Sequence, residues 1–537
     1  MVILSKRKFK YYGLLFLKHD LSAGLSVFLV ALPLCLGIAL ASGAPLYTGI
    51  LSGIIGGLIV SLLSGSPLSV SGPAAGLTTV VGGILLSYNN YPMFMAIVVG
   101  AGIFQLLLGL LRLGSIANYF PASVIKGMLA AIGVILISKQ LPVAIGYGHP
   151  DFWSKEFINL VSSTHLFSNI EELYSSLSSG ALIITLLSLG AYYLWEKPAF
   201  DKVRFIPVPL FVVGSSIALQ IFFKHFIPGI ALNETQLVKI PQHLFSSFQL
   251  PDFTVFAKHT DAIKWALVIG TLASLETLLS VEAIDKLDPW HRTTPTNREL
   301  MAQGAGNILC GFAGALPITA VIVRSSANID AGGRTKMSAF THGIFMIGAV
   351  MLIPFVINQI PLAALASILV VTGFKLTRPK LYRSMFKLSP KQFLPFVITI
   401  IVILFTDLLI GVTIGLILSI LFIFYKNYKA DYDFKSIFLA IRNKYKVDFD
   451  SSKETKLGIT THTIKLHANV SFLDKSPIRE LLNAVPHYSC VVIDGTNTKT
   501  IDHDVLETIS EFCENAKRNG IEVQLKNVAR VSLSDIH

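Results

Sequence analysis

The chain has 537 residues, of which 53% are hydrophobic and 14% are charged, and its mean hydropathy is +0.64. These values exclude an ordinary set of soluble domains and indicate a membrane protein. The formal net charge is +12, but the basic residues lie between apolar runs rather than in one patch with interleaved aromatics. They therefore argue against a nucleic-acid partner and are interpreted as topology signals.

The first 20 residues are basic and lead directly into an apolar run at 21–42, which contains Pro33. A second apolar run follows at once, so we expect the first span to be retained rather than cleaved as a signal peptide. Taking about 20 apolar residues as one crossing, we predict about fourteen spans between Leu21 and Tyr425. The clearest lie at 21–42, 46–65, 93–112, 181–196, 207–223, 262–282, 338–356 and 408–425, and shorter ones at 73–88, 317–330 and 363–378.

The basic residues between the predicted spans define an orientation. With the N-terminus inside, the short loops assigned outside carry no Lys or Arg, and two longer outside loops are expected at about 139–180 and 224–261. The basic residues assigned inside are Arg112, Lys126, Lys197, Lys202, Arg204, Lys286, Arg292, Arg298, Arg334, Lys336, the run 375–391, Lys426 and Lys429. The pattern predicts a multi-pass protein of a bacterial inner (plasma) membrane with both termini in the cytoplasm.

Two segments within the apolar part are broken by glycine and proline, at 69–79 and 311–320. Such backbone is tolerated at membrane depth only where it is buried in protein or lines a cavity. In each segment a proline introduces a short apolar run, which is typical of a half-helix with proline at its first position. Two half-helix starts facing each other would form an anion site, and small residues would let a ligand approach the backbone. The small residues are Ala74, Ala75, Thr319 and Ala320. A simple tight turn between full helices is left open for each segment.

Charged residues inside spans are rare and indicate function by default. Glu276 lies centrally in an apolar run, where Thr277 or Ser280 could add a hydroxyl for a coupling proton or sodium ion. Arg324 lies about one turn beyond the second broken segment and could add positive potential to an anion site. The alternative, in which Glu276 and Arg324 neutralise each other structurally, is left open.

Several absences argue against an enzyme. The four cysteines show no metal-ligand spacing, and the sequence contains no recognisable nucleophile, metal cluster or nucleotide loop. We therefore expect no metal and no cofactor other than a coupling sodium ion or proton.

The chain after Lys429 becomes polar. We predict a transmembrane domain at 1–430, a linker at 431–456 and a small β/α domain at 457–537. Its expected strands are 463–468, 490–493 and 522–525, and its expected helices are 475–484 and 504–519. This alternation predicts a sheet covered by helices.

Four motifs in the apolar part resemble the SulP family, the sulfate permease or solute carrier 26 group of anion transporters. They are Leu32-Pro33 to Ala39, Val70-Ser-Gly-Pro73, Leu275-Glu276-Thr277-Leu-Leu, and the stretch from Asn297 through Ile308 to Thr335. The resemblance implies a membrane all-α fold of two inverted seven-helix repeats, arranged as core and gate. It also implies an elevator-type secondary active transporter of a small inorganic anion, with the substrate between spans 3 and 10.

Carried over residue by residue, the resemblance assigns the substrate site to Pro33, Ala74, Ala75, Ala320, Val321, Ile322 and Arg324. It also implies that the first span breaks at Pro33, beside the site. The acidic position of span 8 falls on Glu276, and the hydroxyl one turn later on Ser280. Sodium-coupled bicarbonate members typically carry Asp and Thr where this chain has Glu276 and Ala74, which leaves proton coupling open. Bicarbonate is slightly preferred over sulfate.

The polar tail resembles a STAS domain, with Val491-Val-Ile-Asp494-Gly-Thr496 as its strand-to-loop element. The phosphorylated serine of anti-sigma-antagonist relatives falls on His503 or Asp504, so phosphoswitching is not expected there. The resemblance favours a homodimer and a cytoplasmic partner of this domain, in contact with membrane lipid elsewhere. The alternatives are a dicarboxylate or nucleobase permease on the same fold, and a membrane-anchored STAS regulator.

Overall fold

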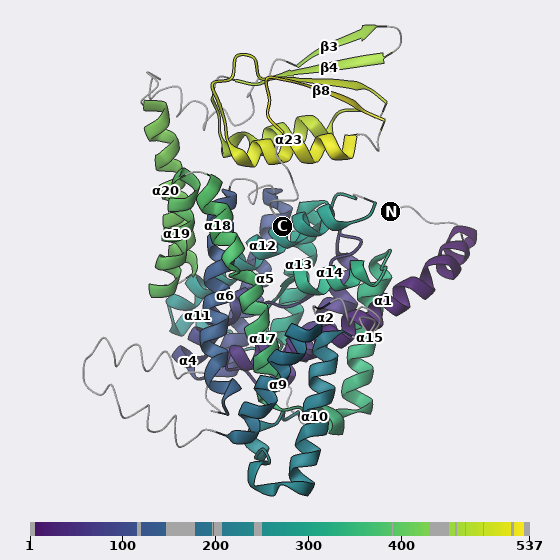
Figure 1. Ribbon diagram of the computed structural model, residues 1–537, viewed down its shortest axis with the longest axis vertical. Helices are drawn as coiled ribbons and strands as arrows, with labels where there is room; N and C mark the ends of the chain where they lie inside the picture. Colours follow the sequence, from purple (N-terminus) through teal and green to yellow (C-terminus); the bar gives the residue numbers. More distant parts are fainter. Residues whose placement is uncertain are drawn as a thin grey trace. The chain divides into compact units, whose positions relative to one another are not determined.

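The computed structural model describes the chain in segments (Figure 1). They are residues 6–114, 120–146, 178–195, 197, 207–240, 250–290, 292–388, 390–406, 408–428, 451–456, 459–467, 469–486, 488–516 and 520–530. The chain divides into two compact units, the first formed by residues up to Gly114 and by Ile132–Thr377, the second by Ser115–Ala131 and by the residues from Arg378 on. The linker residues 431–450 and most of the outside loop predicted at 139–180 lie outside the described residues.

The first unit is almost entirely helical. Its first half contains α1 (Lys6–Ala41), α2 (Leu46–Ile55) continued by the π-helical turn η1 (Gly56–Val60) and α3 (Ser61–Leu63), then η2 (Ala75–Leu77), α4 (Thr78–Tyr88), α5 (Tyr91–Leu110) and most of α6 (Ala122–Ala144). Its middle contains α9 (Ser179–Trp195), α10 (Val208–Phe226), η5 (Pro228–Ile230), η6 (Glu234–Gln236), α11 (Val255–Lys258) and α12 (Asp261–Leu287). The remainder is α13 (Thr296–Ala313), α14 (Ile322–Asp330), α15 (Lys336–Leu352), α16 (Pro354–Ile357) and α17 (Leu362–Leu376).

Membrane-spanning character is evident in the helices themselves. The described residues hold seven helices long and apolar enough to cross a bilayer and five shorter apolar ones. Each of the eight clearest predicted spans overlaps one of these helices, as expected when about 20 apolar residues at 1.5 Å rise match the hydrocarbon thickness. The helix Ala122–Ala144 was not among the named spans, and the predicted span 317–330 contains only β2 and the nine-residue α14. The total of about fourteen spans and the inverted repeats remain predictions.

Two local predictions at prolines are wrong. The first concerns Pro33, where a break was expected: α1 continues through it to Ala41. The second concerns the half-helices, which were expected to begin at the prolines. Pro73 instead ends the short strand β1 (Ser71–Pro73), and the helical turn begins only at Ala75. Similarly, Pro317 precedes β2 (Ile318–Ala320), and α14 begins at Ile322.

The physical reason is that β1 and β2 pair with each other. They form an antiparallel ladder in which Ser71 lies opposite Ala320, Gly72 opposite Thr319 and Pro73 opposite Ile318. Backbone groups that would be unpaired in two isolated helix starts are satisfied across this ladder, as burial requires. The two broken segments are therefore joined before each enters its helix.

The second unit combines helices with a β/α domain. Besides the start of α6, it contains α18 (Pro379–Leu388), α19 (Pro390–Phe405) and α20 (Leu408–Tyr428). The four-stranded sheet has the order β3 (Ser451–Lys456), β4 (Ile459–Lys465), β6 (Cys490–Asp494) and β8 (Glu522–Lys526). The first pair is antiparallel and the other two are parallel. A small parallel pair, β5 (Asn469–Val470) with β7 (Thr500–Ile501), the turn η8 (Phe472–Asp474) and the helices α22 (Lys475–Asn483) and α23 (His503–Ala516) complete the domain.

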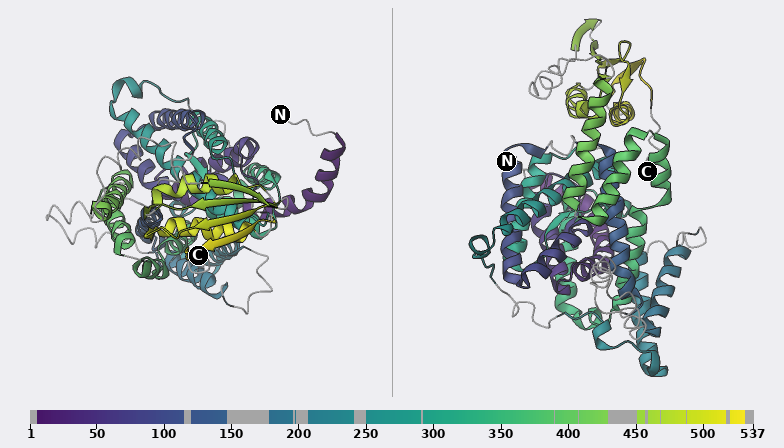
Figure 2. Two further views of the ribbon diagram at one scale, coloured as in Figure 1. Left: turned by 90° about the horizontal axis from the view of Figure 1, so that it is seen from above. Right: turned by 90° about the vertical axis from the view of Figure 1, so that its left-hand side faces the viewer.

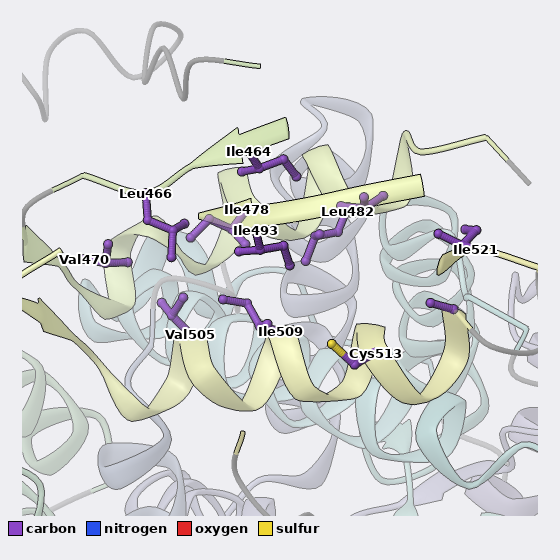
Figure 3. Packing of buried hydrophobic residues seen from close by; sticks show 12 residues of the cluster. Ile464, Leu466, Val470, Ile478, Leu482, Ile493, Val505, Ile509, Cys513 and Ile521 are labelled. Atoms are coloured by element: carbon purple, nitrogen blue, oxygen red, sulfur yellow. The ribbon is translucent and has the colours of Figure 1, made fainter. Parts of the chain in front are cut away.

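The helices α22 and α23 lie on one face of this sheet (Figures 1 and 2). Val505, Ile509 and Cys513 recur every four residues along α23 and point toward the sheet (Figure 3). They pack against Ile464 and Ile493 of the central strands. This amphipathic periodicity explains why the sequence forms a helix that covers a sheet.

The three predicted strands of the tail overlap β4, β6 and β8, and its two predicted helices overlap α22 and α23. The strands β3, β5 and β7 were not predicted. β3 lies within 451–456, which had been assigned to the linker, so the sheet begins earlier than expected. Ser451–Lys456 is polar and lacks an apolar alternation, and pairing with β4 rather than local sequence places it in the sheet. Residues 457, 458, 468, 487, 517–519 and 531–537 of the predicted domain lie outside the described residues.

Candidate anion site

The candidate site is centred on the β1–β2 ladder. The ladder is extended by a hydrogen bond from the Val321 N–H to the Val70 carbonyl at 3.0 Å, and the Val70 N–H donates to the Ser325 hydroxyl at 2.9 Å. The Ser71 backbone of β1 lies so close to the π-helical turn η1 that a Cβ at Gly56 would overlap it. A glycine at this position is what allows the two backbones to approach.

The helix starts on either side of the ladder bring the predicted substrate residues together. Ala74 precedes η2 in an extended conformation, with φ −108°, and Val321 precedes α14 with φ −119°. The first N–H groups of any α-helix have no carbonyl partner within the helix. Among the predicted residues, Ala74, Thr319 and Ala320 are buried, whereas Ala75, Val321 and Ile322 are partly exposed.

Arg324 is the charged group at this place. Its side chain is 0% exposed and occupies the space beside Gly72 that a side chain there would fill. One guanidinium nitrogen, Nη2, makes a long contact of 3.5 Å to the Pro73 carbonyl, whereas Nε and Nη1 have no hydrogen-bond partner. Within the part of the chain that the structure describes, no carboxylate pairs with Arg324. The expected alternative, a neutralising pair with Glu276, is therefore not what the structure contains.

The surroundings of Arg324 are contributed by two further helices. The Cys35 thiol of α1 and the His342 ring of α15 are both buried and lie close enough to interact electrostatically with the guanidinium. α1 also packs against β1 and α4, and Pro33 is buried in this part of the helix. Pro33 therefore lies in a helix that borders the site, although it does not break that helix.

The predicted coupling residues of α12 contact both broken segments. The Glu276 carboxylate accepts a hydrogen bond from the Gly76 N–H, and its Oε2 would lie 2.8 Å from a Cβ at Gly76. The Thr277 hydroxyl accepts from the Ala320 N–H at 3.3 Å. Ser280 is buried about one turn farther along α12. The helix α12 thus places an acidic side chain in contact with η2 and a hydroxyl in contact with β2.

Three side chains that sequence reasoning did not single out also contact the ladder region. Glu299, Gln303 and Asn307 lie at intervals of four residues on α13, and each is 0% exposed. Their spacing places them on one helix face. A polar stripe inside an otherwise membrane-embedded helix was the signal that could have identified them.

In the second unit, the structure brings together three groups that could in principle hold a metal. The ligand atoms of His503, Asp504 and Glu507 lie within 4.8 Å of one another. However, the Asp504 carboxylate accepts from the Ala122 N–H at 2.9 Å, and the neighbouring Asp502 accepts from the Gln392 amide at 3.3 Å. Burial, and then the nearby charge of Asp502, raise the pKa of Asp504 to about 6. These contacts are sufficient to account for the cluster without a metal.

Comparison with known proteins agrees with the geometry. The model of the sulfate permease family matches residues 17–399. The chain is 28% identical to YvdB of Bacillus subtilis (strain 168), provisionally named a sulfate transporter, over 77% of this chain and 75% of that protein. It is 26% identical to the bicarbonate transporter BicA of Picosynechococcus sp. (strain ATCC 27264 / PCC 7002 / PR-6), over 75% and 69%.

A solved structure extends the likeness in fold to the second unit. The murine solute carrier 26 family member A9 anion transporter in its inward-facing state matches with a TM-score of 0.60 at 17% identity, over 97% of this chain and 87% of that chain. Members of the matched family are transporters rather than enzymes. With its apolar helices and its matched residues, this multi-pass integral membrane protein belongs to the sulfate permease family.

Proposed function

We propose that the protein is a secondary active transporter of a small inorganic anion, which binds between the starts of η2–α4 and α14. The observation that carries this proposal is the fully buried Arg324, whose Nε and Nη1 atoms have no hydrogen-bond partner. Burying an unpaired cation is strongly unfavourable, so such a group requires a compensating negative charge. An anion bound at the ladder supplies that charge during the transport cycle.

The backbone of the site supports the same proposal. Helix starts carry partial positive charge and free N–H donors, and both are favourable for an anion. Ala74, Ala75 and Ala320 place only methyl groups beside these donors. A small anion can therefore approach the backbone closely.

For the substrate we propose bicarbonate or sulfate, with bicarbonate preferred. The names of the two relatives include one bicarbonate transporter and one sulfate transporter. Both anions are small, charged and rich in acceptor oxygens, as a site built from amide donors and one guanidinium requires. A nucleobase would instead require several acceptors for its ring N–H groups, and the predicted site offers a single acid, Glu276.

We propose that Glu276 couples transport to a proton or a sodium ion, assisted by Thr277 and Ser280. The contacts of Glu276 to Gly76 and of Thr277 to Ala320 support this role, because a change in charge at Glu276 is felt directly by the broken segments. The proposed movement is of the elevator type, with two seven-helix repeats forming core and gate. We also propose that the protein is a homodimer in a bacterial inner membrane, with both termini and a STAS domain in the cytoplasm. There the STAS domain binds a protein partner.

The test is uptake of labelled bicarbonate and sulfate into proteoliposomes, with and without sodium and with and without a pH gradient. We expect saturable uptake of both anions, with a lower KM for bicarbonate, and we expect one of the two gradients to increase it. An Arg324→Met variant, which replaces the buried cation with a side chain of similar length, should bind the anion at least tenfold more weakly by calorimetry. Saturable binding of equal affinity in that variant, with the protein folded, would refute the proposed site.

The coupling role has its own variant. Glu276→Gln should abolish accumulation driven by the ion gradient while leaving anion exchange partly intact, because the amide cannot change charge. Unchanged accumulation in Glu276→Gln would exclude the coupling role but leave the anion site standing.

A further inference from the structure

The polar face of α13 connects to both strands of the ladder. Glu299, Gln303 and Asn307 are fully buried, and buried polar groups must find partners to be tolerated. Apart from the Gln105 side chain of α5 and one contact between Gln303 and Glu299 themselves, their partners are groups of the two broken segments and of the loop that enters β1.

Asn307 pairs with the backbone of β2. Its Oδ1 accepts from the Ile318 N–H at 2.6 Å and its Nδ2 donates to the Ile318 carbonyl at 3.0 Å. Ile318 lies opposite Pro73, which has no N–H to donate. The Asn307 amide therefore makes the two hydrogen bonds to the Ile318 backbone that a paired strand would otherwise make. The Gln105 side chain of α5 accepts the second Nδ2 hydrogen of Asn307 at 2.5 Å.

Gln303 and Glu299 hold the other strand. The Gln303 Nε2 donates to the Ser71 hydroxyl at 2.7 Å and to Glu299 Oε1 at 3.0 Å. The second carboxylate oxygen of Glu299 accepts from the Ser64 hydroxyl at 2.5 Å and from the Gly65 N–H at 3.1 Å. β1 and the loop before it are therefore tied to the same helix face that holds β2.

α13 is itself firmly packed against α5. A Cβ at Gly304 would lie 2.6 Å from the Leu106 nitrogen and 2.8 Å from the Gly102 carbonyl oxygen. A Cβ at Gly102 would likewise lie 2.5 Å from the Ile308 nitrogen. Helices that meet backbone to backbone through small residues leave little freedom for one to shift against the other. α13 is thus a stiff support rather than a flexible tether.

We propose that Gln303 and Asn307 are positioning residues that set the separation of the two helix starts and thereby the size of the anion that the site accepts. The part about the anion rests on the proposed function. The part about the strands rests only on the hydrogen bonds described above. Hydrogen bonds to a fixed helix determine where each strand lies, and the amide donors of η2 and α14 follow directly after those strands.

The first experiment measures selectivity with the full-length protein in proteoliposomes. The variants are Asn307→Ser, which loses the paired contact to Ile318, and Gln303→Met, which keeps the length of the side chain but loses its donors. The control is Ser367→Ala on α17, where a hydroxyl that is also 0% exposed bonds only to its own helix, at the Ala363 carbonyl. We expect the ratio of the apparent KM values for sulfate and bicarbonate to change at least threefold in the two variants and to stay unchanged in the control. A ratio unchanged in both folded variants would overturn the proposal.

This readout separates positioning from simple stabilisation. If the two residues only stabilised the fold, the variants would lower the amount of active protein, and hence Vmax, while every remaining molecule kept the native ratio of KM values. A double variant gives a further check, because Ser71→Ala removes the partner of Gln303. The effects of Ser71→Ala and Gln303→Met on the ratio should be less than additive, since both delete the same hydrogen bond between Gln303 and Ser71.

The second experiment does not depend on transport. Ser71 and Ala320 lie opposite each other in the ladder, so the pair Ser71→Cys and Ala320→Cys should form a disulfide when treated with iodine. Adding Asn307→Ser should slow this cross-linking at least fivefold, whereas adding Ser367→Ala should not. An unchanged rate would overturn the positioning role. Slower cross-linking in a protein that transports neither anion would support positioning and count against the proposed function.

Discussion

Gly72→Ala is the substitution that should test the anion site most directly. A Cβ at Gly72 would overlap Arg324 Nη1 and would lie 3.1 Å from Cζ. Since an ordinary heavy-atom contact is at about 3.5 Å or more, the guanidinium has to withdraw by roughly 1.5 Å. Gly72 has no positive φ, so the backbone itself accepts alanine without strain.

The magnitude follows from Coulomb's law. At an effective dielectric constant of about 20, opposite unit charges attract by about 4 kcal/mol at ~4 Å and by about 3 kcal/mol at ~5.5 Å. The loss of about 1 kcal/mol corresponds to a roughly sixfold weaker Kd for the anion. Overpacking should add a loss of about 1–3 kcal/mol in stability, which lowers Tm but leaves a folded protein to measure.

The assay is calorimetric titration of the detergent-solubilised protein with bicarbonate and with sulfate. The matched control is Gly83→Ala, because a Cβ at Gly83 of α4 has no neighbour within 4 Å. We expect its Kd to equal that of the unmodified protein and its helix to be more stable by about 0.5–1 kcal/mol. An unchanged Kd in folded Gly72→Ala, or an equal loss of affinity in Gly83→Ala, would show that the position of the Arg324 guanidinium does not determine anion affinity.

Three further predictions concern stability. The pKa of Asp504 is raised to about 6 in the folded protein, so the folded state binds this proton more tightly than the unfolded state, and the stability that Asp504 contributes should fall as pH rises from about 4 to 6. Asp504→Asn should therefore flatten the dependence of Tm on pH in this window. An unaltered Tm profile would contradict the raised pKa. The Asp20 carboxylate accepts hydrogen bonds from the Arg334 N–H at 2.8 Å and the Thr335 N–H at 3.1 Å, at the start of α15. Asp20→Asn should therefore destabilise the protein by about 1–2 kcal/mol, measured as a lower Tm. An equal Tm would show that these contacts contribute little to stability. Ile509 lies in the core of the β/α domain. Ile509→Ala should lower the free energy of unfolding by about 2–5 kcal/mol because of the cavity it leaves, measured by denaturant titration. An unchanged free energy of unfolding would mean that the neighbouring side chains fill the cavity.

The parts of this protein that follow a local pattern could be predicted from the sequence. Apolar runs of about 20 residues identified the long helices, and the alternation of β-like and helix-like runs in the tail identified a sheet covered by helices. The breaks at Gly72-Pro73 and near Pro317 were recognisable because glycine and proline interrupt helices wherever they occur. Glu276 and Arg324 were recognisable as candidate site residues because charge inside spans is rare.

Partners distant in the chain could not be predicted in this way. Which residue of 71–73 lies opposite which residue of 318–320 depends on packing between segments nearly 250 positions apart. For the same reason the helices begin after the paired strands rather than at the prolines, and β3 joins the sheet despite its polar sequence. Local pattern was therefore enough to identify two broken segments in the apolar part of the chain and two charged residues inside spans. Contacts between distant elements, which local preference does not specify, pair the two segments and attach both to α13. The same contacts bury Arg324 beside the segments, with no carboxylate paired to it among the described residues.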